Sequence, residues 1–352
     1  MAFLGDKGSC MSVSAPAAPL VASAHRRPVP IAIALCVALA GAVVLSLMVG
    51  ARALSPGKCS ASSSCRRREV HDIVLGLRLD RTIIAVVVGA ALGGAGALMQ
   101  ALTRNPLADP GLLGVNAGAA AAVVAGIAFF DVTAPEMQIW WAFVGAALAS
   151  VAVYLLGSGG RAAATPVRLA LAGAALTAVL TAFISGVSLS SQASYDAMRF
   201  WFVGSVVGRE LSVLWLALPF IVVGAVAALL VTPALNAMAL GADSGRALGL
   251  NIGRLRLVTA VAITLLCGAA TAVAGPIAFL GLVLPHVARH LVGPDQRWVV
   301  PLSMLMAATL LVLADVAGRI VTDGEVAAGI MCALVGAPVF ILLVRRRRLA
   351  HL

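Results

Sequence analysis

Four ionisable side chains inside apolar runs are the residues of this sequence that could do chemistry. His286, Arg289 and His290 lie near the end of one apolar run, and Asp315 lies in the next. Ionisable groups in a hydrocarbon environment are rare and usually functional. A relay through His286 and Asp315 could serve a proton-coupled secondary transporter. All four also lie toward the ends of their runs, where side chains can reach water, so satisfied or snorkelling residues are the alternative.

No known catalytic constellation accompanies these groups. The sequence has no HExxH metal motif, no CxxC pair and no GxxxxGK[ST] phosphate-binding loop. Its one Gly-Lys pair, Gly57-Lys58, is followed by Cys59 and lacks the upstream glycine. We therefore expect no catalytic residue, no metal site and no enzyme activity. If ATP drives this protein, another chain must hydrolyse it.

Composition indicates an all-α polytopic membrane protein. The 352 residues are 61% hydrophobic and 11% charged, whereas soluble domains carry about 25% charged residues. Apolar runs of the roughly 20 residues needed to span a bilayer recur along the chain. The net charge of +11 is typical of basic loops that orient membrane helices and contact anionic lipid. We expect membrane lipid, and no nucleic acid, among the partners.

The apolar runs predict about ten transmembrane helices within one membrane domain, residues 30–348, after a disordered cytoplasmic tail, residues 1–29. The first run reads as a retained helix. A cleaved signal peptide ending near residues 51–53, or a twin-arginine signal at Arg26-Arg27, is the alternative. The predicted helices are about 31–50, 83–103, 112–130, 139–156, 167–190, 211–232, 257–274, 277–292, 299–318 and 326–344.

Two polar breaks interrupt the apolar pattern. The first predicts a rigid turn made of Arg104, Asn105, Pro106, Asp109 and Pro110. The second, residues 236–256, is too polar and glycine-rich to span lipid, and predicts one or two short helices at the membrane surface. The GxxxG pairs at residues 89 and 93, and at 114 and 118, favour close helix packing.

Cysteines and basic residues bear on location. Cys36, Cys267 and Cys332 lie in apolar runs and are predicted to be buried. Cys59 and Cys65 flank a serine-rich loop and could form a disulfide or remain free thiols. Most of the 25 Lys and Arg residues fall on the side of the termini, including the arginines at 345–348. The positive-inside rule therefore predicts that both termini are cytoplasmic.

Several long motifs in order resemble the iron-siderophore/vitamin B12 ABC permease family of the FecCD type. The first is Arg-Leu-x-Arg-Thr followed by a Gly- and Ala-rich helix and Arg-Asn-Pro-Leu-Ala-Asp-Pro-Gly-Leu-Leu-Gly-Val. The resemblance extends over roughly residues 31–348. The remaining motifs lie at residues 239–250, 274–286, 313–319 and 336–340.

The resemblance implies a type II ABC importer permease, similar to the vitamin B12 permease. It implies a permease dimer (of identical or sister chains), two cytoplasmic ATPase subunits that use ATP and Mg, and an extracytoplasmic siderophore-binding protein. This chain would bind no cofactor itself. The location is then a bacterial cytoplasmic (inner) membrane. The expected cargo is a ferric siderophore, with cobalamin or haem as the alternative.

The resemblance also implies site residues. Arg78, Arg81 and Arg319 match positions where such permeases dock the binding protein. The segment 236–250 matches the ATPase-coupling helices, with Leu240, Gly241, Arg246, Ala247, Leu248 and Gly249 as the coupling residues. The sequence departs from the family pattern at Asp80, where a proline is usual, and at Glu325 to Gly329. The loop of residues 59–68 has no counterpart in the pattern.

Overall fold

The chain folds into a bundle of long helices. The computed structural model describes residues 28–49, 76, 78–158, 166–190, 195, 201–321 and 325–345, and these are helical apart from turns and short links. The helices are α1 (Pro28–Met48), α3 (Leu79–Thr103), the 3-10 turn η2 (Pro110–Leu113), α4 (Val115–Phe130), α5 (Pro135–Ser158), α6 (Pro166–Ser190), α8 (Leu211–Ala239), α9 (Ala242–Ala247), α10 (Ile252–Ala274), α11 (Leu280–Val292), α12 (Gln296–Ile320) and α13 (Ala328–Arg345).

Each of the ten predicted helices has a counterpart among these elements, α9 is a short helix within the segment 236–256 where one or two were predicted, and η2 is additional. Within the described part of the chain, seven helices are long and apolar enough to cross a bilayer, and α4, α11 and α13 are shorter apolar helices. The predicted all-α polytopic fold is confirmed. The tail before residue 28, the loop with Cys59 and Cys65 and the arginines at 346–348 lie outside the described residues.

Helix α3 forms the centre of the bundle. It packs against α12, α10 and α11, and 78% of its apolar window is buried. A Cβ atom at Gly93 would overlap the Ser303 carbonyl of α12, and one at Gly96 would overlap the Gly281 backbone of α11. The small residues of α3 therefore let three backbones approach closely, which is the packing role that the sequence favours.

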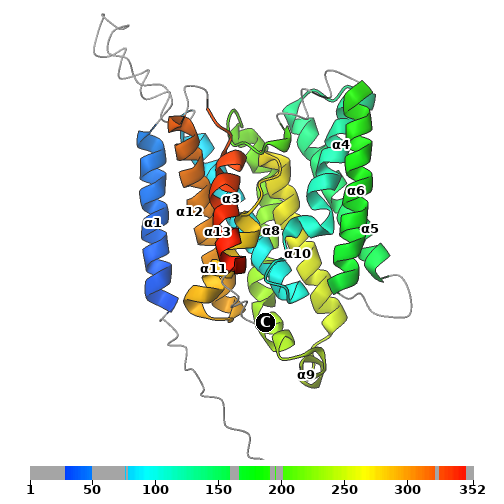
Figure 1. Ribbon diagram of the computed structural model, residues 1–352, viewed down its shortest axis with the longest axis vertical. Coiled ribbons are helices and arrows are strands. Elements are labelled where there is room, and N and C mark those ends of the chain that lie inside the picture. Colours follow the sequence, from blue (N-terminus) through cyan, green and yellow to red (C-terminus); the bar gives the residue numbers. More distant parts are fainter. Residues whose placement is uncertain are drawn as a thin grey trace, which may run out of the picture.

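The bundle has two distinct flanks (Figure 1). Helices α1 and α12 lie on one flank, and α4, α5 and α6 on the other, with α8 and α10 between them. The short α9 projects from the end at which α8 finishes and α10 begins. We call this the α9 end. The opposite end, where α1 and α12 finish and α3 begins, is called the arginine end.

Several helix boundaries differ from the predictions by three residues or more, among them those of α8, α10 and α11. Helix α8 continues to Ala239, through Pro219 and Pro233, so the predicted coupling segment begins inside a long helix. Helix α10 starts already at Ile252, because the Asn251 side chain accepts a hydrogen bond from the Arg254 N–H at 3.0 Å and caps it. Helix α11 starts only at Leu280, because Phe279 has a left-handed backbone conformation with φ of 69°.

The turn after α3 is built from local polar contacts. Arg104 ends α3 in a left-handed conformation. Asn105 accepts a hydrogen bond from the Leu107 N–H at 2.9 Å, and Asp109 accepts one from the Gly111 N–H at 2.8 Å. Burial raises the pKa of Asp109, and the hydrogen bond from Gly111 opposes that shift. These contacts start η2 at Pro110 and delay the next helix to residue 115.

Candidate functional site

Two arginines of the arginine end converge on one buried carboxylate. Arg81 donates to Asp315 from Nε at 2.8 Å, and Arg319 donates to the other oxygen of Asp315 from Nη2 at 2.5 Å. The exposed fractions are 8% for Arg81, 4% for Arg319 and 1% for Asp315. Asp315 therefore connects the start of α3 to the end of α12 through charge-assisted hydrogen bonds in a nearly dry environment.

A second carboxylate completes the charge balance of this cluster. Glu325, in the link before α13, accepts a hydrogen bond from Arg81 Nη1 at 2.8 Å, and its side chain is 31% exposed. Two guanidinium groups and two carboxylates then give no net charge. A buried ion cluster is tolerable only when its members are paired in this way.

Arg319 and a third arginine, Arg78, cap the end of α1. Arg319 donates to the carbonyl oxygens of Ser46 and Val49, at 2.8 and 3.0 Å, and Arg78 donates to the carbonyl of Leu47 at 3.1 Å. Cations near the C-terminus of a helix complement its dipole and satisfy its last carbonyls. Arg78 and Arg319 therefore attach α1 to the bundle.

These contacts define the surroundings of the three arginines predicted to dock the binding protein. Arg81 and Arg319 are not projected outward; they are buried and paired within the chain. Arg78 alone of the three is partly exposed. Asp80 lies in the first turn of α3, where the helix dipole favours an acid. The arginines can be buried because the fold brings Asp315 and Glu325 to the same end of the bundle. In the sequence, Asp315 lies 234 residues after Arg81, and Glu325 lies 244 residues after it.

Side chains at the α9 end are exposed, whereas Arg81 and Arg319 at the arginine end are buried. Leu240 and Leu248 are 74% and 65% exposed, and they flank α9. Arg246 donates to Asp243 at 2.7 Å, but both side chains remain in solvent. Gly241 and Gly249, with φ of 122° and 81°, form the sharp bends on either side of α9. The short helix therefore stands apart with two large apolar side chains uncovered.

Polar contacts tie the α9 end to the rest of the bundle. Asn236 of α8 donates to Asp295 at 2.6 Å and accepts from the Gln296 N–H at 2.8 Å, at the start of α12. Arg104, after α3, donates to the Met238 carbonyl. Force on α9 can therefore pass through α8 to both α12 and α3. Neither contact was expected from the sequence, because the partners are far apart along the chain.

The histidines of α11 form a separate cluster. His286 and His290 lie with their Nε2 atoms 3.1 Å apart, and Arg289 donates to Gln100 of α3. Sequence reasoning singled out both histidines, but it did not use their HxxxH spacing, which places them on one face of the helix. The structure does not join His286 to Asp315, whose carboxylate is occupied by the two arginines. It therefore shows no relay between them, and no group of three or more His, Cys, Asp or Glu able to hold a metal occurs among the described residues.

Other unpredicted polar residues lie at the arginine end. Ser46 of α1 and Thr82 of α3 share a hydrogen bond of 2.8 Å.

Cys267 and Cys332 are buried as predicted, but Cys36 is exposed. The prediction that Cys36 is buried is wrong, because α1 packs against α12 with one face only and the rest of the helix surface is uncovered.

Known proteins are similar to this chain over most of its length. Residues 36–346 match the FecCD transport family. The ferric enterobactin transport system permease protein FepD of Escherichia coli is 47% identical over 308 residues, which are 87% of this chain and 92% of that protein. The iron(3+)-hydroxamate import system permease protein FhuB of Bacillus subtilis is 40% identical over 279 residues, 79% of this chain and 72% of that protein.

A solved structure has the same fold. An inward-facing conformation of a metal-chelate type ABC transporter superposes with a TM-score of 0.80 at 26% identity, and the match covers 90% of this chain and 99% of that one. The helix order described above is therefore that of an ABC transporter membrane chain.

Proposed function

The chain belongs to the FecCD transport family, and on that premise we propose that it is the permease subunit of an ABC importer that carries a ferric siderophore. A separate pair of ATPase subunits powers it, and a substrate-binding protein delivers the cargo. The identity to FepD and FhuB, whose names specify ferric enterobactin and iron(3+)-hydroxamate, supports a ferric chelate over cobalamin or haem.

The α9 end is the surface for the ATPase subunits in this proposal. Leu240 and Leu248 offer exposed apolar side chains on a short projecting element, and Gly241, Arg246, Ala247 and Gly249 hold or flank it. ATP and Mg bind to the partner, whose closure pushes on α9. The contacts of Asn236 and Arg104 then carry that displacement into α12 and α3 as a rigid-body motion.

The arginine end is the surface for the binding protein. Arg78 offers a partly exposed cation directly. Arg81 becomes available only if Glu325, the partly exposed acid of the cluster, gives up its place to an acid of the docked protein. Docking and release of the α13 link would then be one event. Arg319 stays bound to Asp315 and to the end of α1, so its role in docking is to hold this surface in place. Docking has a cost, which is the breaking of the pair of Arg81 and Glu325.

The remaining parts of the proposal concern assembly. Two such permease chains, identical or sister, enclose the path, and the chain crosses a bacterial cytoplasmic membrane with both termini on the α9 side. The binding partners shift the equilibrium between the inward- and outward-open states by binding one better than the other.

Uptake measurements in membrane vesicles test the function. Vesicles holding the full transporter should take up a ferric catecholate or hydroxamate chelate only with ATP inside and the binding protein outside. Equal or faster uptake of cobalamin or haem would change the assigned cargo. Uptake that persists without ATP, and that follows an imposed proton gradient, would instead support a secondary transporter.

A further inference from the structure

The last turns of α11 carry two histidines whose rings approach each other through their nitrogens. His286 and His290 are four residues apart, so they lie on the same face of the helix. Their Nε2 atoms are 3.1 Å apart, whereas their ring centroids are 4.7 Å apart, with an angle of 81° between the ring planes. Both rings therefore direct their Nε2 edges into one shared space.

The distance between the two nitrogens fits two bonds to one metal ion. A zinc–nitrogen bond is about 2.0–2.1 Å long, so nitrogens 3.1 Å apart can bind the same ion with an angle of roughly 100° at the metal. This angle is close to the tetrahedral geometry that zinc prefers. Two histidines at positions i and i+4 of a helix also bind zinc in HExxH sites. The pair thus has the geometry of a chelate.

The charge state of the pair favours a metal ion as its ligand. Two protonated imidazoles would repel each other at this distance, and Arg289 in the same turn adds a further positive charge. A neutral imidazole has one nitrogen that donates and one that accepts. With the protons on the Nδ1 atoms, both Nε2 lone pairs face the same space, and this is the form in which histidine binds metals.

Arg289 lowers the affinity for a cation, but it does not occupy the pair. Its guanidinium donates to the side chain of Gln100 in α3, which is fully buried. Within the described part of the chain, no third histidine, cysteine or acid joins His286 and His290. Water or a small anion must therefore supply the remaining ligands of the ion, and an anion would offset the charge of Arg289.

The pair can be reached from water at the α9 end. His286 is 7% exposed, whereas the side chain of His290 is exposed. Helix α11 ends at Val292, and Asp295 follows, which accepts the hydrogen bond from Asn236 of α8. An ion that arrives from the aqueous phase can therefore bind His290 first and then His286.

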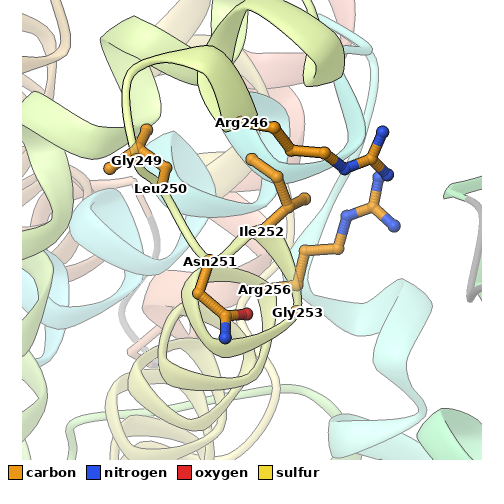
Figure 2. A pocket seen from close by; sticks show the side chains of 7 residues that line it. All are labelled: Arg246, Gly249, Leu250, Asn251, Ile252, Gly253 and Arg256. Atoms are coloured by element: carbon orange, nitrogen blue, oxygen red, sulfur yellow. The ribbon is translucent and has the colours of Figure 1, made fainter.

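The pocket beside α9 lacks ligands of this kind. Its volume is about 470 Å³, and its lining includes Arg246, Asn251 and Arg256 but no histidine, cysteine, aspartate or glutamate. Figure 2 shows the two arginine side chains extending to the same side of this pocket. A guanidinium donates hydrogen bonds and has no lone pair to offer a metal. A divalent ion is therefore expected at the histidine pair and not in this pocket.

We propose that His286 and His290 together bind a divalent transition-metal ion of the zinc, nickel or copper class. Imidazole nitrogens suit these ions, whereas calcium and magnesium prefer oxygen ligands. The ion joins two successive turns of α11 and stabilises the end of that helix. The site goes beyond the proposed function, because it depends neither on the cargo nor on the ATPase subunits.

Zinc binding to the purified transporter tests the site. The full-length chain is co-purified with its partner subunits through a tag that contains no histidine, and Zn²⁺ binding is measured by isothermal titration in detergent. We expect the wild-type transporter to bind an additional Zn²⁺ ion per permease chain relative to His290→Ala. Saturating Zn²⁺ should also raise the thermal midpoint of the wild-type permease chain by about 2 °C or more, because the ion binds the folded state.

Variants at residue 290 locate the site, because this side chain is exposed and its replacement leaves the core intact. His290→Ala should lose both the additional ion and the rise in the midpoint. His290→Cys should keep both, since a thiolate also binds zinc. His351→Ala, which removes another of the five histidines of the sequence, should change neither. Ca²⁺ in place of Zn²⁺ should not raise the midpoint of the wild-type chain.

Three results would overturn the proposal. The first is equal zinc binding, with an equal rise in the midpoint, in the wild-type transporter and in His290→Ala. The second is loss of the additional ion in a folded His290→Cys variant, which would mean that residue 290 is not a ligand. The third is a rise with Ca²⁺ as large as that with Zn²⁺, which would mean that oxygen ligands elsewhere hold the ion.

Discussion

The two ends of the bundle use the same residue type in opposite ways. At the arginine end, Arg81 and Arg319 are buried and share Asp315. At the α9 end, Arg246 pairs with Asp243 in open solvent. A guanidinium removed from water must be paired, because an unpaired buried charge is very costly. An exposed one gains little from its partner, so it stays available to another molecule.

The contrast suits the two ends of the bundle to different roles. The arginine end stabilises the fold, and the α9 end is accessible to partner proteins. The paired cluster joins α1, α3, α12 and the link before α13, so its first role is to fix four segments. The α9 end joins α8 to α10 and presents apolar and basic groups outward. At the arginine end, Arg81 can meet a partner only by breaking its pair with Glu325, whereas the α9 end can meet one without any rearrangement.

The largest effect is expected from Asp315→Asn. It leaves two buried arginines without their shared acid, so the variant should lose about 3–5 kcal/mol of stability. The measurement is the thermal midpoint of the purified chain in detergent. The double variant Asp315→Leu with Arg319→Leu removes one cation together with the acid, and it should recover part of the loss. An unchanged midpoint for Asp315→Asn would contradict the buried cluster.

The next effect is expected at the α9 end. Leu240→Ala combined with Leu248→Ala should weaken binding of the ATPase subunits by about tenfold or more, because each exposed leucine loses contact area in the complex. Co-purification and ATPase assays measure this. Leu230→Ala is the control, since Leu230 is also 74% exposed on α8 but lies within the apolar span. Equal weakening by the control would contradict α9 as the ATPase surface.

A smaller effect is expected from Glu325→Gln. Arg81 keeps Asp315, and Glu325 is partly exposed, so the loss of stability should be about 1 kcal/mol or less. Because Arg81 no longer has to be released, the binding protein should dock more tightly to the transporter in vesicles. Glu210→Gln, an exposed acid before α8 on the same end, should leave docking unchanged. Weaker docking of Glu325→Gln would refute the displacement step.

The smallest effect is expected from Asp243→Asn. Its pair with Arg246 is solvent-exposed, so the thermal midpoint should not move measurably. The same kind of change, Asp to Asn beside an arginine, is thus predicted to be severe at residue 315 and silent at residue 243. A clear loss of stability in Asp243→Asn would show that α9 is packed more tightly than its exposure indicates.

The sequence predicted much of the fold because hydropathy is local information. Each long apolar run became a helix, and the glycines of α3 pack where the GxxxG spacing favoured close contact. Boundaries were missed where single residues decide them: Asn251 caps α10 earlier than expected, and Phe279 delays α11. The exposure of Cys36 could not be read from its run, since an apolar residue in a membrane protein faces lipid or core equally well.

What the sequence determined by itself was the class of protein, the set of helices and the family motifs. These follow from the bilayer requirement for long apolar helices and from ordered short motifs. Only the tertiary structure decided the state of the arginines. Arg81 lies 234 residues before Asp315, and no spacing rule links such positions. Burial and pairing depend on which helix ends meet in space, and that same meeting makes one end of the bundle closed and neutral and leaves the other open and basic.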